Sequence, residues 1–230
     1  MMSSEHSELR TIKHRLSEIL PRVGAAILCC VAVTLTVLNV QRAKSRTQEA
    51  DTTPQKLVQD WRSYGSDGDW LGPRTAKLVV IEFSDYECSA CGVLAGRLAA
   101  LQKRLPSFSI VVRQFPLPLH IVGTNAARAA KCASAAGHFD QFESRAFSLV
   151  SASSTVDWNS YARAIGIADT ASFDRCLHGQ WSADAVNVDL EAGQKLGIVG
   201  TPTLLIGNEE YVGVPWDLEA IVTRHLRGNI

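Results

Sequence analysis

Two cysteines separated by two residues are the part of the sequence best suited to chemistry. Cys88 and Cys91 stand in the segment CSAC, and the apolar side chains after them recur at helical spacing up to residue 105. Unpaired backbone N–H groups and the positive end of the helix dipole favour a thiolate at a helix N-terminus. We therefore expect a lowered pKa for Cys88, whereas Cys91, one turn further on, is expected to be buried and protonated. The two sulfur atoms are close enough for a disulfide, so the pair can exchange disulfides with other thiols.

Other interpretations of this pair carry no redox chemistry. A C-x-x-C segment can form half of a zinc site, but a structural zinc site needs a second close pair, and the cysteines at 132 and 176 are single. The pair can also be an inert disulfide. A module that binds or delivers a metal through Cys88 and Cys91 is a further alternative from a different functional class.

The cysteine pair lies between two predicted strands of one sheet. KLVVIEF at 77–83 and SFSIVVRQF at 107–115 are apolar, β-branched runs, which are typical of strands buried in a sheet. With the helix between them they form a right-handed βαβ unit. Near the C-terminus, GIVGTPTLLIGN at 197–208 predicts a turn, a buried strand and a turn. EEYVGV then predicts its hairpin partner and PWDLEAIVTRHL a final amphipathic helix, so the fold class is α/β.

Thr201 and Pro202 open the predicted C-terminal strand. Proline is tolerated there because the first residue of a strand needs no N–H group. A cis peptide bond at this point would turn the backbone of Thr201 outward, where it can pair with an extended substrate chain. The dipeptide alone indicates only a turn, and its combination with the cysteine pair makes it a candidate substrate-binding loop.

Glu82 is an acid inside the apolar run VVIEF. A carboxyl group in a buried strand must be hydrogen-bonded or protonated, and burial raises its pKa toward neutrality. A carboxyl group of that kind is suited to carry a proton to and from the Cys91 sulfur. The alternative is a position at a sheet edge where Glu82 faces solvent.

Roughly seventy residues between the two halves of this pattern predict a helical region. The predicted helices span 123–136, 138–151, 157–165, 170–178 and 182–196. Cys132 and Cys176 fall on two of them and can form a disulfide, which the chain-entropy model credits with up to ~4 kcal/mol. Two alternatives are a zinc site completed by His138 and His178 and a pair of free buried thiols.

The N-terminal part predicts one membrane anchor. Residues 23–41 carry no charge and reach about 28 Å as a helix, close to the thickness of the hydrocarbon layer. A cleaved signal peptide is the alternative, although the apolar stretch is long for one. We expect a tail at 1–22, the anchor at 23–41, a linker at 42–74 with a short strand near 57–61, and a globular domain at 75–230. Cys29 and Cys30 lie within the anchor and are expected to be unreactive.

Composition excludes several classes of protein. The 230 residues include 23 basic and 23 acidic side chains without a dense basic cluster, which argues against a nucleic-acid binder. An apolar fraction of 46% is typical of a globular protein rather than a disordered chain.

Three motifs in order give the chain a family resemblance. EFSDYECSAC, PLPLH and GTPTLLIGN, within residues 71–227, resemble the DsbA-like thioredoxin-fold oxidoreductases, and in particular their membrane-anchored branch. The resemblance implies a thioredoxin fold with a helical insertion at about 121–196. It also implies a nucleophilic Cys88, a resolving Cys91, a buried acid at Glu82 and a cis-proline loop at Thr201 and Pro202. Some members carry a second, structural disulfide, which would correspond to Cys132 and Cys176.

The resemblance implies a thiol-disulfide oxidoreductase that faces the periplasm or another extracytoplasmic space. Its clients would be reduced or unfolded proteins, its redox partner a quinone-linked membrane protein, and it would need no metal and no organic cofactor. The dipeptide Ser89-Ala90 departs from the proline and histidine or aromatic residue of strongly oxidising members. A reductase, for example in cytochrome maturation, is therefore the alternative to a disulfide donor. An isomerase is less favoured because the tether is too short for the dimerisation domain that usually precedes the fold in that class.

Overall fold

The computed structural model describes residues 31–36, 53–152 and 155–228. The chain divides into two compact units, residues 1–50 and 51–230. In the first, residues 31–36 are helical. The rest of the expected anchor, including Cys29 and Cys30, lies outside the described residues. Among the residues described, no helix has the length and hydropathy needed to cross a bilayer.

One sheet organises the second unit. In the described chain it has six strands in the order β1, β6, β5, β3, β4, β2. The central strand β3 runs parallel to β4 and antiparallel to β5. The strands are β1 (Lys56–Leu57), β2 (Asp69–Leu71), β3 (Leu78–Ser84), β4 (Phe108–Gln114), β5 (Thr203–Ile206) and β6 (Glu209–Val212).

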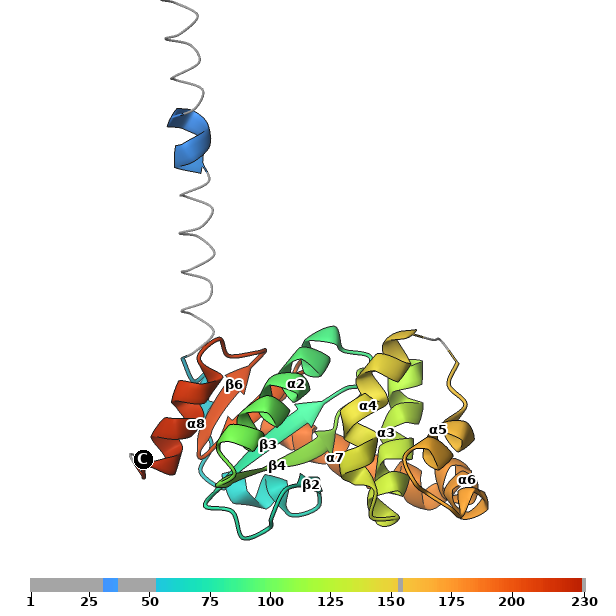
Figure 1. Ribbon diagram of the computed structural model, residues 1–230. Coiled ribbons are helices and arrows are strands. Elements are labelled where there is room, and N and C mark those ends of the chain that lie inside the picture. Colours follow the sequence, from blue (N-terminus) through green and yellow to red (C-terminus); the bar gives the residue numbers. More distant parts are fainter. Residues whose placement is uncertain (1–30, 37–52, 153–154, 229–230) are drawn as a thin grey trace, which may run out of the picture. The chain divides into compact units, whose positions relative to one another are not determined.

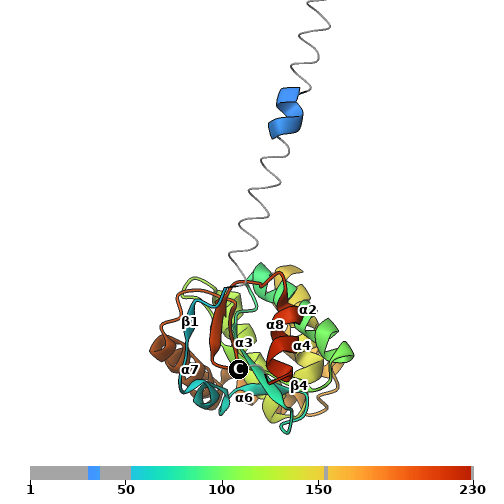
Figure 2. The same ribbon diagram turned by 90° about the vertical axis from the view of Figure 1, so that its left-hand side faces the viewer.

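Helices cover both faces of this sheet. In the described part of the sequence, five of them lie between β4 and β5. The helices are α2 (Ser89–Arg104), α3 (Ile121–Ala135), α4 (Phe139–Ala152), α5 (Trp158–Ala164), α6 (Thr170–His178), α7 (Gln180–Leu196) and α8 (Leu218–Leu226). Figure 1 shows α3 to α6 gathered at the end of the unit away from α8, and Figure 2 shows α7 and α8 on opposite sides of the sheet. The thioredoxin fold with an inserted helical region is thereby confirmed, and the five inserted helices lie within two residues of their predicted bounds.

Side-chain alternation along β3 divides the core into two apolar clusters. Leu78 and Val80 pack with Leu94 and Leu98 of α2, on the face that α4 and α8 also cover. Ile81 and Phe83 point to the other face and pack with the end of α7. A residue of β3 at an even position therefore lies beneath α2, which matters for Glu82.

The prediction of a linker over 42–74 is wrong for residues 56–71, which form two strands and a 3-10 helix. β1 pairs with β6 and β2 pairs with β4, with the 3-10 helix η1 (Trp61–Gly65) between them. Val58 and Trp61 are buried in the cluster of Ile81 and Phe83. The globular domain therefore begins before residue 75. Strands of two and three residues are too short to show the alternation by which a strand is recognised in a sequence.

Candidate active site

Cys88 and Cys91 occupy the first turn of α2, as the motif predicts. Cys88 is the N-cap residue, and its carbonyl oxygen accepts hydrogen bonds from the backbone N–H groups of Cys91 at 3.0 Å and Gly92 at 3.2 Å. Cys88 is half-buried and Cys91 is completely buried, and both are free thiols. One sulfur therefore lies within reach of another protein, while the other lies beneath it in the core.

The loop before β5 meets the cysteine pair. The Thr201-Pro202 peptide bond is cis, and the Cys88 Sγ–H donates to the Thr201 carbonyl oxygen at 3.3 Å. Pro202 is buried and Thr201 is half-buried. The structure thus brings together Cys88 and Thr201, which lie 113 residues apart in the sequence.

Cys91 is held in its thiol form. Burial raises the pKa of the Cys91 thiol strongly, the contact with Cys88 raises it further, and Glu82 adds a smaller rise when it is ionised. The Asp85 backbone and Thr201 lower the pKa, by less than burial raises it. A Cys91 thiolate released by disulfide cleavage will therefore take up a proton.

Glu82 lies in the centre of the sheet. It stands opposite Val112 of β4 and Leu204 of β5, and it is 1% exposed. The alternative of a solvent-facing edge position is therefore wrong. Burial raises the pKa of Glu82 to about 8, the charge of Glu143 adds to this shift, and the nearby Ser84 side chain opposes it. At neutral pH the carboxyl group holds a proton, on the sheet face that α2 covers.

Glu143 of α4 is a second buried acid, which was not predicted from the sequence. Its Oε2 accepts a hydrogen bond of 2.6 Å from the Tyr86 hydroxyl, and burial raises its pKa to about 7, against the effect of that bond. The segment FDQFESRAF contains the signal that reveals it. Phe139, Phe142 and Ala146 mark the buried stripe of the helix, and Glu143 falls within that stripe.

Asp85 fixes the loop that leads to Cys88. Its buried carboxylate accepts hydrogen bonds from the backbone N–H groups of Glu87 and Leu117, both at 2.9 Å, and contacts His120 Nδ1 at 2.6 Å. Glu87 in turn accepts from the Gly123 N–H at 2.7 Å, in the first turn of α3. These contacts join the active-site loop to the start of the helical insertion.

The fold and the site have counterparts among known proteins. A family model described as thioredoxin matches residues 66–222. The chain belongs to the thioredoxin family. The thioredoxin part of the resemblance seen in the motifs is confirmed, and the fold is shared with a DsbA-type protein, whereas the membrane-anchored branch stays a prediction.

Two solved structures illustrate the shared fold of this thioredoxin-family chain. The thiol-disulfide exchange protein alpha-DsbA2 from Wolbachia pipientis has a TM-score of 0.63 at 19% identity, over 84% of this chain and 97% of that one. A periplasmic thioredoxin-like protein from Salmonella enterica serovar Typhimurium has a TM-score of 0.57 at 20% identity, over 75% of this chain and 99% of that one.

Curated relatives of the chain include proteins named as sodium/proton antiporters. The chain is 30% identical over 155 residues to the Na(+)/H(+) antiporter NhaA 1 of Mycobacterium sp. (strain KMS), over 66% of this chain and 25% of the antiporter. The chain therefore spans about a quarter of the length of the curated relatives it matches.

In this thioredoxin-family chain the helical insertion carries a second cysteine pair. Cys132 of α3 and Cys176 of α6 form a disulfide with a Cα–Cα distance of 5.9 Å. Both sulfur atoms are thus used, which contradicts the alternatives of free thiols and of zinc ligation with His138 and His178. Among the described residues, no three or more His, Cys, Asp or Glu side chains are grouped as metal ligands.

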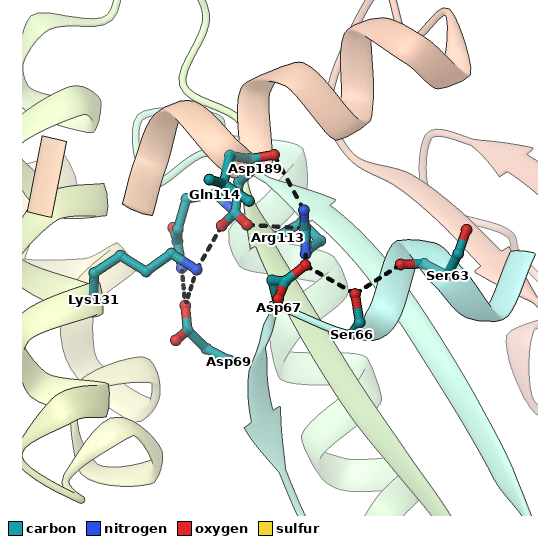
Figure 3. A network of polar contacts seen from close by, with 9 residues as sticks. Ser63, Ser66, Asp67, Asp69, Arg113, Gln114, Lys131 and Asp189 are labelled. Carbon is teal, nitrogen blue, oxygen red and sulfur yellow. Dashed lines mark hydrogen bonds and ion pairs between the residues drawn. The ribbon is translucent and has the colours of Figure 1, made fainter. Parts of the chain in front are cut away.

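A buried ionic network joins this insertion to the thioredoxin sheet, and the sequence analysis missed it (Figure 3). Asp189 of α7 contacts Arg113 of β4 at 2.9 Å and Lys131 of α3 at 2.7 Å. Lys131 also contacts Asp69 of β2 at 3.0 Å, and the backbone N–H of Gln114 donates to Asp189 at 2.8 Å. Four elements that are distant in the sequence thus meet in one buried cluster.

Proposed function

We propose that this chain exchanges disulfides with extracytoplasmic client proteins through Cys88 and Cys91, as a disulfide donor. The arrangement of the two sulfur atoms is the observation that carries the proposal. Cys88 is accessible at the positive end of α2, while Cys91 is buried, favours its protonated form, and shares the region beneath α2 with the protonated Glu82. The accessible sulfur is suited to be attacked, and the buried one can leave because Glu82 supplies it with a proton.

The reaction transfers two electrons from client to enzyme. A client thiolate attacks Cys88 Sγ in the Cys88–Cys91 disulfide, a client–Cys88 bond forms, and Cys91 leaves as a thiolate that takes the proton of Glu82. A second client thiolate then attacks the client sulfur of the mixed disulfide and expels Cys88. The client gains a disulfide, and the enzyme is left with two reduced cysteines. A quinone-linked membrane protein would return the enzyme to its oxidised form.

The loop of Thr201 and Pro202 is proposed to bind the client backbone. The Thr201 carbonyl lies 3.3 Å from Cys88 Sγ, so a peptide that pairs with the Thr201 backbone is placed beside the attacked sulfur. Recognition through backbone groups accepts clients of many sequences, as a general disulfide donor requires.

We place the domain of residues 51–230 in an extracytoplasmic compartment, tethered by the anchor at 23–41. The relative from Salmonella is described as periplasmic, and disulfides such as Cys132–Cys176 persist in oxidising compartments. The part shared with the antiporters is proposed to be the thioredoxin fold. A stretch of 155 residues in a chain of 230 must include the segment of Cys88 and Cys91. Ion transport is not proposed for this chain.

Replacing Cys91 with serine is expected to trap client proteins on Cys88. The variant keeps the accessible sulfur but lacks the thiol that resolves a mixed disulfide from within the enzyme, so adducts accumulate. Non-reducing gels of cells that express the variant should show bands that disappear on reduction. The matched control is the double variant Cys88→Ser and Cys91→Ser, which leaves no sulfur in the motif. Absence of adducts from Cys91→Ser, or equal adducts in the double variant, would contradict the proposal.

The redox potential of the Cys88–Cys91 couple separates the donor from the reductase. A donor is expected to have a potential between about −180 and −120 mV, the range of strongly oxidising relatives of thioredoxin. Equilibration with glutathione redox buffers, followed by alkylation and mass analysis, measures it. A potential near the thioredoxin value of about −270 mV would show that the chain works as a reductase.

A further inference from the structure

Glu143 and Glu82 enter the same buried layer, although one belongs to the helical insertion and the other to the sheet. Side chains alternate along β3, so Glu82 shares a face with Leu78 and Val80. Those two residues pack in the cluster that also contains Phe142 of α4, the neighbour of Glu143. Both carboxyl groups are thus buried on the side of the sheet that α2 and α4 cover, where a charge on Glu143 is felt by Glu82.

Tyr86 holds Glu143 in this layer. Its hydroxyl donates to Glu143 Oε2 at 2.6 Å, and its ring packs against Phe142 and Phe147 of the same helix, with centroid distances of 5.6 and 4.9 Å. Glu143 Oε1 has no hydrogen-bond partner among the described residues, and neither has Glu82 Oε1. Each carboxyl group therefore keeps an oxygen that can carry a proton without breaking a hydrogen bond.

A cleft between α2 and α4 reaches Glu143 but not Glu82. It has a volume of about 560 Å³, and α2 contributes to it mainly small residues, among them Gly92, Ala95, Gly96 and Ala99. A Cβ atom on Gly96 would meet nothing within 4 Å, so this part of the cleft is open. Glu143 lies in its wall and is 8% exposed, against 1% for Glu82. Of the two acids, Glu143 is the one that solvent in the cleft approaches.

Other charged groups around the pair come from four elements. Asp69 of β2 raises the pKa of Glu143, and it is itself paired with Lys131 of α3 at 3.0 Å. Lys103 of α2 and Asp140 of α4 line the cleft and are exposed. Burial contributes most to the raised pKa of Glu82, and the charge of Glu143 contributes second.

We propose that Glu143 is a positioning residue for disulfide exchange, which gains and loses its own proton at the α2–α4 cleft and thereby controls when Glu82 gives a proton to Cys91. When Glu143 is a carboxylate, its charge opposes a second charge in the same layer and keeps the proton on Glu82. When Glu143 is neutral, Glu82 releases its proton at lower pH. The helical insertion thus sets the pH range in which Cys91 is a good leaving group. The proposal rests on the role of Glu82 in the proposed function.

Replacing Glu143 with glutamine is expected to move the pH dependence of exchange. The measurement is the rate of reaction of the oxidised full-length chain with dithiothreitol between pH 5 and 10. The ionisation of this probe is the same for every variant, so differences between profiles belong to the protein. In the wild type, Glu82 loses its proton as the pH rises through about 8, so its contribution to the exchange rate is lost there. In Glu143→Gln, we expect this fall in rate to occur about one pH unit lower, because the charge of Glu143 no longer raises the pKa of Glu82.

Two further variants make the test specific. Asp140→Asn removes a carboxylate from the same helix and the same cleft but from an exposed position, and we expect its profile to match the wild type. Tyr86→Phe removes the hydrogen bond that favours the Glu143 carboxylate, so the loss should again move to lower pH. This second variant keeps the test decisive if Glu143→Gln does not fold.

Glu82→Gln separates failure of this inference from failure of the proposed function. If Glu82→Gln removes the inflection but Glu143→Gln or Tyr86→Phe leaves it at the wild-type pH, the role of Glu143 is overturned and that of Glu82 stands. If Glu82→Gln leaves the inflection in place, the role of Glu82 in the proposed function is overturned, and that of Glu143 with it. A shift in Asp140→Asn equal to that in Glu143→Gln would also overturn the inference, since any nearby carboxylate would then have the same effect.

Discussion

Replacing Lys131 with methionine is expected to destabilise the folded chain by about 3 to 5 kcal/mol at pH 7, the usual cost of removing one partner of a buried ion pair. Lys131 Nζ contacts Asp189 at 2.7 Å and Asp69 at 3.0 Å, and all three side chains are buried. Methionine fills a similar volume but leaves two carboxylates without the cation between them. Burial already raises the pKa of Asp189 to about 6 while Lys131 holds it down, so removal of Lys131 raises it further.

The sign of the pH dependence follows from that shift. In the variant, the folded-state pKa of Asp189 rises further above the unfolded value, so the folded state holds a proton that the unfolded state releases. Stability is then lost as the pH rises, and the difference between wild type and variant should be smaller at pH 4 than at pH 7. Chemical denaturation at both pH values measures it.

Two control variants distinguish the loss of the ion pair from a general effect of methionine. Lys195→Met, at an exposed position of α7, should change stability by less than about 1 kcal/mol. Adding Asp69→Asn to Lys131→Met restores the charge balance and should recover part of the loss. Equal destabilisation by Lys131→Met and Lys195→Met, or no recovery in the double variant, would show that the network does not hold the insertion on the sheet.

The reactive centre could be predicted because its signals are local. The position of Cys88 and Cys91 follows from a strand, a short turn and a helix that are adjacent in the sequence. Glu82 was visible because a single acid interrupts an apolar run, and that is a sign of burial. The loop of Thr201 and Pro202 gained its meaning only when combined with the cysteines, since a turn proline alone is common.

The ionic network could not be predicted because pairing between distant elements leaves no local pattern. Asp69, Lys131 and Asp189 each look like a solvated charge in their own segments. Asp69 lies in a strand of three residues, whose burial depends on β4 at its side. The buried stripe of α4 was available in the sequence, but an acid within such a stripe is usually taken for its edge. Burial of a charge is a property of the assembled fold.

Replacing Glu82 with glutamine is expected to make the folded chain more stable at alkaline pH and the exchange reaction slower. Burial raises the folded-state pKa of Glu82 to about 8 from an ordinary value of 4.5. Between these values the folded state keeps a proton that the unfolded state releases, so the wild type loses stability as the pH rises. Glutamine does not titrate. Its stability relative to the wild type should therefore increase from pH 4 to pH 9, by about 1.4 kcal/mol for each unit of the shift.

The rate is expected to change in the opposite sense. Glutamine has no proton to give to Cys91, so the reaction of the oxidised chain with a reduced peptide should slow roughly 10²-fold near pH 7, the usual size of general acid catalysis. Glu191→Gln, at an exposed position of α7, should change neither quantity. Damage to the fold lowers stability and rate together, whereas loss of a buried proton donor raises the first and lowers the second. Urea denaturation and stopped-flow kinetics on the same preparations separate the two cases, and a variant that loses stability at pH 9 would assign Glu82 a structural role instead.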